Sequence, residues 1–140
     1  MSDLQDFFAQ NTDSSITEEV IISERFKNKE GKPIPWVLRN LTEAENEEHR
    51  KAATKRVKGK GGASQTETDT NDYMAKLAVA SVVFPDLKNA ELQKSYGVMG
   101  GEDLLRKMLF PGEYAKLLKV IQEINGFDQA MEDLIEEVKN

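Results

Sequence analysis

The chain has 140 residues, of which 39% are hydrophobic and 31% charged, and its formal net charge is −6. A chain of this length usually forms one domain, and it can build a core if its helices carry clear apolar stripes. It contains no cysteine and one histidine, His49, which excludes disulfides and three-histidine zinc sites. No window approaches the roughly 18 apolar residues of a membrane span. The acidic start lacks an apolar signal segment, so we expect an intracellular protein.

The first part of the chain predicts a short helix followed by a β-hairpin. Residues 1–15 form a terminal segment whose short helix places Leu4, Phe7 and Phe8 on one face. Residues 16–26 and 34–41 are the two strands, separated by a polar turn that contains glycine and proline. A two-stranded hairpin is only marginally stable alone, so we expect it to lie against helices.

A polar helix should follow the hairpin, so that residues 16–58 hold both elements. Thr42 and Glu45 make a capping box at its start. Residues 25–60 carry eleven bases and five acids, and the bases concentrate in the segment 50–60. That segment could bind nucleic acid, but acids before bases also suit the dipole of a solvated helix, which we favour. Residues 59–70 are predicted to be a flexible loop because they are rich in glycine, serine and threonine.

Residues 71–140 are predicted to form a helical bundle. Residues 73–84 are apolar nearly all round, which indicates a central buried helix that ends before Pro85. Three short helical units follow in residues 89–127, with Asn89 capping the first and Pro111 opening the third. A terminal helix begins near Asp128. The predicted fold class is α+β and mostly α: an N-terminal β-hairpin followed by a small bundle of about four to six helices, in one domain.

The residues that could perform chemistry do not form any familiar constellation. His49 lies on the polar helix, where an exposed histidine is the ordinary case. The glycine-rich stretch at 59–64 lacks the spacing of a phosphate loop. Acid–base catalysis requires two carboxylates in different environments of one cleft, and the sequence pattern places no such pair. We therefore predict no catalytic, metal-binding or cofactor-binding residues, and we predict that the protein is not an enzyme.

The remaining interpretation is protein binding through apolar side chains. Trp36 is the only tryptophan, a residue enriched at interface hot spots, although we favour the alternative in which it fastens the hairpin to the bundle. The stripe of the terminal helix could dock on a partner helix, or it could close the bundle. The candidate partner-binding residues are Trp36, Met108, Met131, Leu134, Ile135 and Val138.

Several motifs in fixed order suggest a family. The segment 89–127 contains Leu-Gln, Tyr-Gly-Val, Met-Leu, Pro-Gly-Glu-Tyr and Ile-Asn-Gly-Phe in sequence, preceded by Gly-Lys-Pro-Ile-Pro-Trp at 31–36 and Phe-Pro-Asp-Leu at 84–87. Together these resemble the XkdN-like tail assembly chaperones of tailed bacteriophages and prophages. The resemblance covers the chain from about the first strand to Phe127, and it is carried by the order of the motifs.

The resemblance implies a small non-enzymatic chaperone in the host bacterial cytoplasm. Its expected partner is the tape measure protein, a long and largely helical chain that it keeps soluble while the tail tube assembles, and it is expected to be absent from the mature virion. Further candidate partners are a frameshifted longer form of the chain, the tail tube protein and a second copy of the chain. The alternatives are a regulatory nucleic-acid-binding protein that uses residues 50–60, and a structural tail component.

Overall fold

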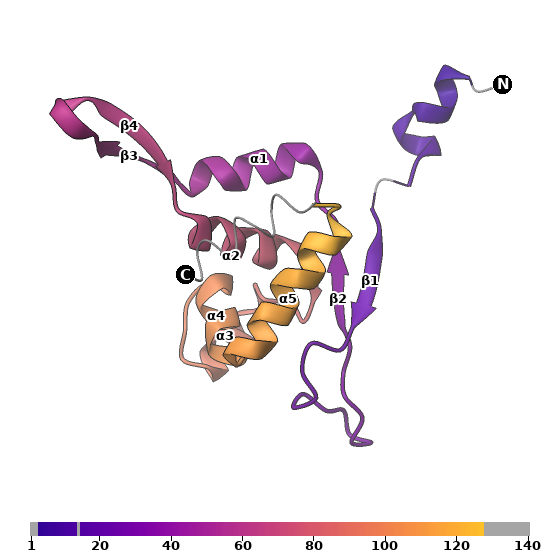
Figure 1. Cartoon of the computed structure of the whole chain (residues 1–140). Coiled ribbons are helices and arrows are strands. Elements are labelled where there is room, and N and C mark those ends of the chain that lie inside the picture. The colour runs from indigo at the N-terminus through magenta and orange to yellow at the C-terminus, as the bar shows by residue number, and fades with distance from the viewer. Residues whose placement is uncertain (1–2, 14, 128–140) are drawn as a thin grey trace.

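The computed structural model describes residues 3–13 and 15–127 (Figure 1). Within them, strands and helices combine as the predicted α+β fold, and an N-terminal hairpin precedes most of the helices, so this prediction is confirmed. The elements, in chain order, are two short 3-10 helices η1 (Leu4–Phe7) and η2 (Ala9–Asn11), β1 (Thr17–Val20), β2 (Trp36–Arg39), α1 (Glu43–Ala52), β3 (Thr54–Lys58), η3 (Lys60–Gly62), β4 (Ser64–Thr68), α2 (Thr70–Ser81), β5 (Val82–Phe84), α3 (Ala90–Ser95), α4 (Gly101–Met108) and α5 (Pro111–Ile124).

The predicted hairpin is present, but it belongs to a three-stranded sheet of order β1-β2-β5. Strand β1 pairs antiparallel with β2, from Thr17 opposite Arg39 to Val20 opposite Trp36. Both strands are shorter than the sequence indicates. The third strand, β5, occupies residues that the sequence pattern assigns to the end of the apolar helix. Two β-branched residues, Val82 and Val83, favour the extended form just before Pro85, where proline itself disfavours helix.

A second hairpin corrects two predictions. The polar helix begins with the expected capping box at Thr42, but it ends at Ala52 and does not extend through the predicted range that closes at residue 58. The stretch expected to be a flexible loop, 59–70, supplies a turn, strand β4 and the first residue of α2. Strands β3 and β4 pair antiparallel, from Thr54 opposite Thr68 to Lys58 opposite Ser64. Alternating threonines support this pairing, and we call residues 54–68 the ribbon.

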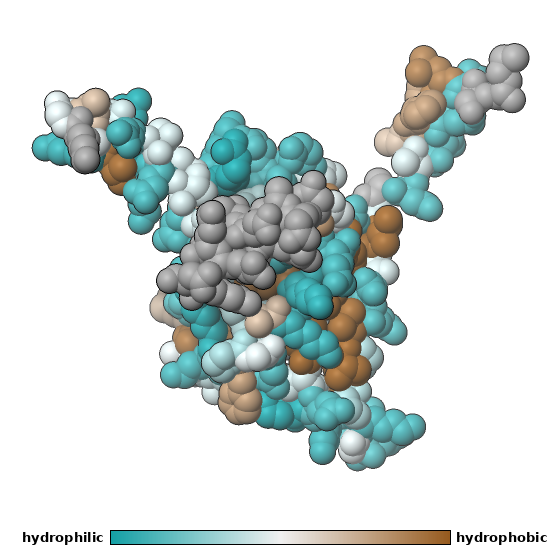
Figure 2. All heavy atoms as spheres, in the orientation of Figure 1, coloured by the Kyte–Doolittle hydropathy of each residue, from teal (hydrophilic) through white to brown (hydrophobic). Residues whose placement is uncertain are grey.

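Two parts of the molecule project from different sides of its body, toward the upper left and the upper right of Figure 1. One is the ribbon, and the other is the N-terminal arm, which we define as residues 3–13. The arm carries Leu4 and Phe7 with 73% and 76% of their surface exposed. Figure 2 shows hydrophobic atoms on this arm, well separated from the rest of the described chain. The predicted short helix of the terminal segment is therefore present, within the described residues, as two 3-10 turns without a buried side chain.

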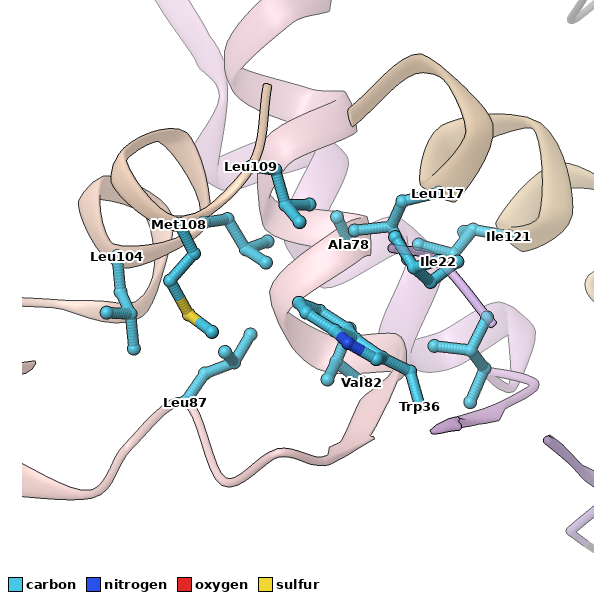
Figure 3. Close-up of a cluster of buried hydrophobic side chains, with 12 residues drawn as sticks. Ile22, Trp36, Ala78, Val82, Leu87, Leu104, Met108, Leu109, Leu117 and Ile121 are labelled. Atoms are coloured by element: carbon cyan, nitrogen blue, oxygen red, sulfur yellow. The ribbon is translucent and has the colours of Figure 1, made fainter. Parts of the chain in front are cut away.

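Helix α2 lies at the centre of the core, as its apolar sequence predicts. One cluster joins it to the sheet and to helices α4 and α5 (Figure 3). A second, smaller cluster packs α2 against the end of α1 through Ala53, Tyr73, Met74 and Leu77. The side chains of the first cluster are Ile22, Trp36, Leu38, Ala78, Val82, Leu87, Leu104, Leu105, Met108, Leu109, Leu117 and Ile121.

Arg25 connects the hairpin to α5. Its guanidinium pairs with Glu113 at 2.6 Å and donates to the carbonyl oxygen of Met108 at 2.8 Å. The same group lies 3.8 Å from the centroid of the Phe110 ring, within range of a cation–π contact. This arrangement gives the exposed Phe110 a partner within the chain and fixes the loop after β1 against the start of α5.

Ser81 gives the first prediction, because its hydroxyl is fully buried at the end of α2. Among the described residues this oxygen has no hydrogen-bond partner. A buried polar group without a partner carries a desolvation cost, and alanine also has the higher helix propensity. The Ser81→Ala variant should therefore raise the free energy of unfolding by about 1 kcal/mol, measured by urea denaturation. A loss of stability would show that the hydroxyl is satisfied in solution.

Candidate functional site

An open groove runs between helices α1 and α2 and the β5 edge of the sheet. Its volume is about 800 Å³. All of the elements that enclose it are held by the core, since α1 and α2 share the second cluster and β5 pairs with β2. The lining residues are Arg39, Glu45, Glu48, His49, Ala52, Lys76, Val79, Ala80, Val82, Val83, Asp86, Leu87, Lys88 and Glu102.

The floor of the groove is apolar. Helix α2 contributes Val79 and Ala80, on the face opposite its most buried residues, and β5 contributes Val83. Val83 is 46% exposed, because Val82 is the residue of this strand that pairs with Leu38 and points into the core. Small and β-branched side chains leave this surface open instead of filling it. The groove therefore presents apolar area to whatever enters it.

The rim of the groove carries charges of both signs. Arg39 pairs with Glu45 at 2.7 Å, and Lys76 bridges Asp72 at 3.1 Å and Glu102 at 3.3 Å. The hydrogen bond from Arg39 is the main reason why the pKa of Glu45 falls to about 2. Burial lowers the pKa of Lys76, but its two carboxylate partners outweigh that effect and leave the pKa raised. These pairs link α1 to the sheet and α2 to α4.

The lowered pKa values of two carboxylates lead us to predict that acid destabilises the fold. Hydrogen bonds from Arg39 and Arg25 are the main causes that hold the pKa values of Glu45 and Glu113 at about 2, below the ordinary value of 4.5. A lowered folded-state pKa contributes stability that is present above pH 4.5 and is lost as the pH falls toward 2. The E45Q/E113Q variant should lose less free energy of unfolding over this window than the unmodified chain. Circular dichroism at a series of pH values measures the difference; equal losses would contradict it.

The volume and lining of the groove are compatible with a short helix as occupant. Its volume matches about two turns of a helix roughly 10 Å in diameter. An amphipathic helix would place its apolar stripe on the floor and its charged flanks beside the rim. In residues 3–13 and 15–127 we find no cluster of three or more histidine, aspartate or glutamate side chains suited to a metal ion. None of the helices described there has the length and apolar character needed to cross a membrane.

The structure places two of the predicted partner-binding residues, Trp36 and Met108, away from this groove. Trp36 and Met108 are 2% and 5% exposed and belong to the core. This supports the alternative in which Trp36 fastens the hairpin to the helices, and its ring lies 6.2 Å from that of Phe26. The other four candidates, in the predicted terminal helix, lie outside the described residues: Met131, Leu134, Ile135 and Val138.

Comparison with known proteins identifies the family. Residues 4–139 match the family described as phage XkdN-like tail assembly chaperone protein. The chain belongs to the XkdN-like tail assembly chaperones. Membership of this family supports a role in phage tail assembly, and the description of the family does not indicate catalysis. The resemblance seen in the ordered motifs of the sequence is confirmed.

Two proteins of Bacillus subtilis (strain 168) are similar along nearly their whole length. The protein YqbN is 37% identical over 99% of this chain and 93% of its own. The phage-like element PBSX protein XkdN is 35% identical over 99% of this chain and 94% of its own. The crystal structure of YqbN aligns with a TM-score of 0.76 at 31% identity, covering 91% of this chain and 99% of that one. The fold described above is thus shared with a relative of known structure.

The groove cannot be recognised from the sequence, although the sequence contains one indication of it. The stretch 73–84 has more apolar residues than a single buried face requires. The simplest interpretation of this surplus is a helix buried on all sides. In this chaperone the surplus residues Val79, Ala80 and Val83 line an open surface instead. An excess of apolar side chains beyond one stripe can therefore indicate a binding surface as well as complete burial.

Proposed function

We propose that this XkdN-like chaperone binds a helical segment of the tape measure protein in the groove between α1, α2 and β5. The observation that carries the proposal is the open apolar floor of Val79, Ala80 and Val83, bordered by charges of both signs. A long amphipathic chain exposes apolar stripes before the tail tube surrounds it, and such stripes aggregate unless they are covered. The bound chaperone keeps the tape measure protein soluble in the host cytoplasm.

The shape of the groove suits many similar segments. Its floor is made of small and branched aliphatic side chains, so it selects apolar stripes without demanding one particular sequence. Its rim contains Lys88 and Glu48, neither of which is in an ion pair among the described residues. Either sign of charge on an incoming helix can find a partner there. The chaperone performs no chemistry in this role, and it leaves when tail tube protein takes its place.

Co-expression tests the proposal. A tape measure protein of the same phage or prophage should be insoluble when expressed alone, and soluble and in complex with the chaperone when the two are produced together. The matched control is co-expression with a groove variant that retains the melting temperature of the unmodified chaperone. If the tape measure protein is neither rescued nor co-purified, the proposed partner is wrong. Detection of the chain in purified particles by mass spectrometry would instead indicate a structural tail component.

A further inference from the structure

Strand β1 has an open edge. In the three-stranded sheet it pairs only with β2, so the N–H and C=O groups on its other side meet no strand among the described residues. Figure 1 shows β1 at the border of the molecule, with nothing beside its outer edge. Three of its four residues are exposed, including Glu18 and Glu19. Open edges of this kind are templates for pairing with another chain.

Strand β3 has an open edge of opposite charge. It pairs only with β4, and the ribbon projects from the other side of the molecule (Figure 1). Its exposed side chains include Lys55, Arg56 and Lys58. Within residues 3–13 and 15–127, neither these cations nor the two glutamates of β1 form an ion pair. The two edges belong to different sheets on different sides of the molecule (Figure 1), so within one chain they do not pair with each other.

We propose that β3 of one copy adds antiparallel to the open edge of β1 of a second copy. This inference does not depend on the groove or on the tape measure protein. Aligning Glu18 with Arg56 brings Glu19 opposite Lys55 and leaves Val20 opposite Thr54. Both central positions then hold opposite charges, and cross-strand pairs of opposite charge stabilise antiparallel sheets. Main-chain hydrogen bonds between the two strands supply the rest of the binding energy, as in other cases of strand addition.

The charges beyond the two strands favour the same orientation. In this alignment the ribbon tip, with Lys58, lies beside Ile16 and points toward the N-terminal arm of the second copy. The arm contains acids and no base, namely Asp3, Asp6 and Asp13. The other edge of the ribbon, β4, is less suitable because it would bring Glu67 beside the glutamates of β1. Since the two edges differ, the contact is head-to-tail and can extend to a ring or a filament.

A charge-swap experiment tests the proposal. Analytical ultracentrifugation of the full chain at low salt should show concentration-dependent association that weakens at high salt. The E18K/E19K and K55E/R56E variants should each raise the dissociation constant by roughly tenfold or more. Mixing these two variants, or combining all four substitutions in one chain, should restore association because opposite charges face each other again. All four side chains are exposed, but Lys55 lies opposite Glu67 within the ribbon, so K55E also opposes like charges there. The K55Q/R56Q variant removes the two cations without this repulsion and should weaken association while it keeps the melting temperature of the unmodified chain.

Hydrogen exchange and a nucleic-acid titration supply the deciding controls. Association should slow amide exchange at residues 17–20 and 54–58, which charge attraction without strand pairing would not do. The proposal would be overturned if the protein were monomeric at every concentration, or if neither double variant changed the dissociation constant of the oligomer. It would also be overturned if K55E/R56E instead abolished salt-dependent binding of a DNA duplex by a monomeric protein, because the cations would then serve a nucleic acid.

Discussion

Replacing Trp36 with alanine should lower the free energy of unfolding by about 3–5 kcal/mol, the range for truncating a buried large aromatic side chain. Only 2% of its surface is exposed, and it packs in the core cluster with residues of α2, α4 and α5 (Figure 3). Its removal leaves a cavity between the sheet and the helices. Trp36 is the largest of the buried side chains that the hairpin contributes, beside Leu38 and Ile22, so strands β1 and β2 should lose their protection from hydrogen exchange first.

A matched control separates burial from aromatic content. Phe7 is 76% exposed on the N-terminal arm and touches neither core cluster. The Phe7→Ala variant should therefore change stability by less than about 0.5 kcal/mol in the same urea titration. If the Trp36→Ala variant were equally mild, the tryptophan would not be fastening the hairpin, and its interpretation as a partner-binding residue would gain weight.

Placing a charge on the floor of the groove should have the largest effect on partner binding. The Val83→Asp variant should weaken binding of the tape measure protein by roughly tenfold or more, because docking would bury a carboxylate without a partner. Val83 is 46% exposed in the free chain, but it lies within β5, where aspartate is less favourable than valine. The Val83→Thr variant keeps a β-branched residue, and it should weaken binding less than Val83→Asp while it retains the melting temperature. Fluorescence anisotropy with a labelled amphipathic segment of the tape measure protein measures the affinity.

The control for this variant is a charge on another exposed apolar residue. Met99 is 89% exposed and does not line the groove. The Met99→Asp variant should bind as the unmodified chain does. Equal weakening by both variants would indicate a diffuse apolar or charge effect, and no weakening by Val83→Asp would place the partner elsewhere on the surface.

Local signals in the sequence predict most of the helices. Asn89 accepts a hydrogen bond from the backbone of Leu92 at 2.9 Å, as expected for the cap of α3. Helix α5 begins at Pro111, and Gly126 follows it with the positive φ of 72° typical of a helix end. Caps and stop residues act within a few positions along the chain, so they can be recognised without knowledge of the tertiary structure.

The strands are harder to predict because their pairing is not local. Strand β5 forms because β2 has a free edge where α2 ends. The residues Val82–Phe84 themselves do not indicate that this edge lies beside them. The polar residues of strand β4 match the composition of a flexible loop equally well, so the sequence predicts a loop there. The groove escapes prediction for the same reason, since it forms only when α1, α2 and β5 come together. Composition describes a residue's preferences, whereas burial depends on neighbours distant in sequence.

The most direct test of the proposed function is a hydrogen-exchange comparison of the free chaperone and its complex with the tape measure protein. We predict slower exchange in the complex along α1, the second half of α2 and β5, the elements that enclose the groove. Slower exchange confined to other elements, with these three unchanged, would contradict binding in the groove.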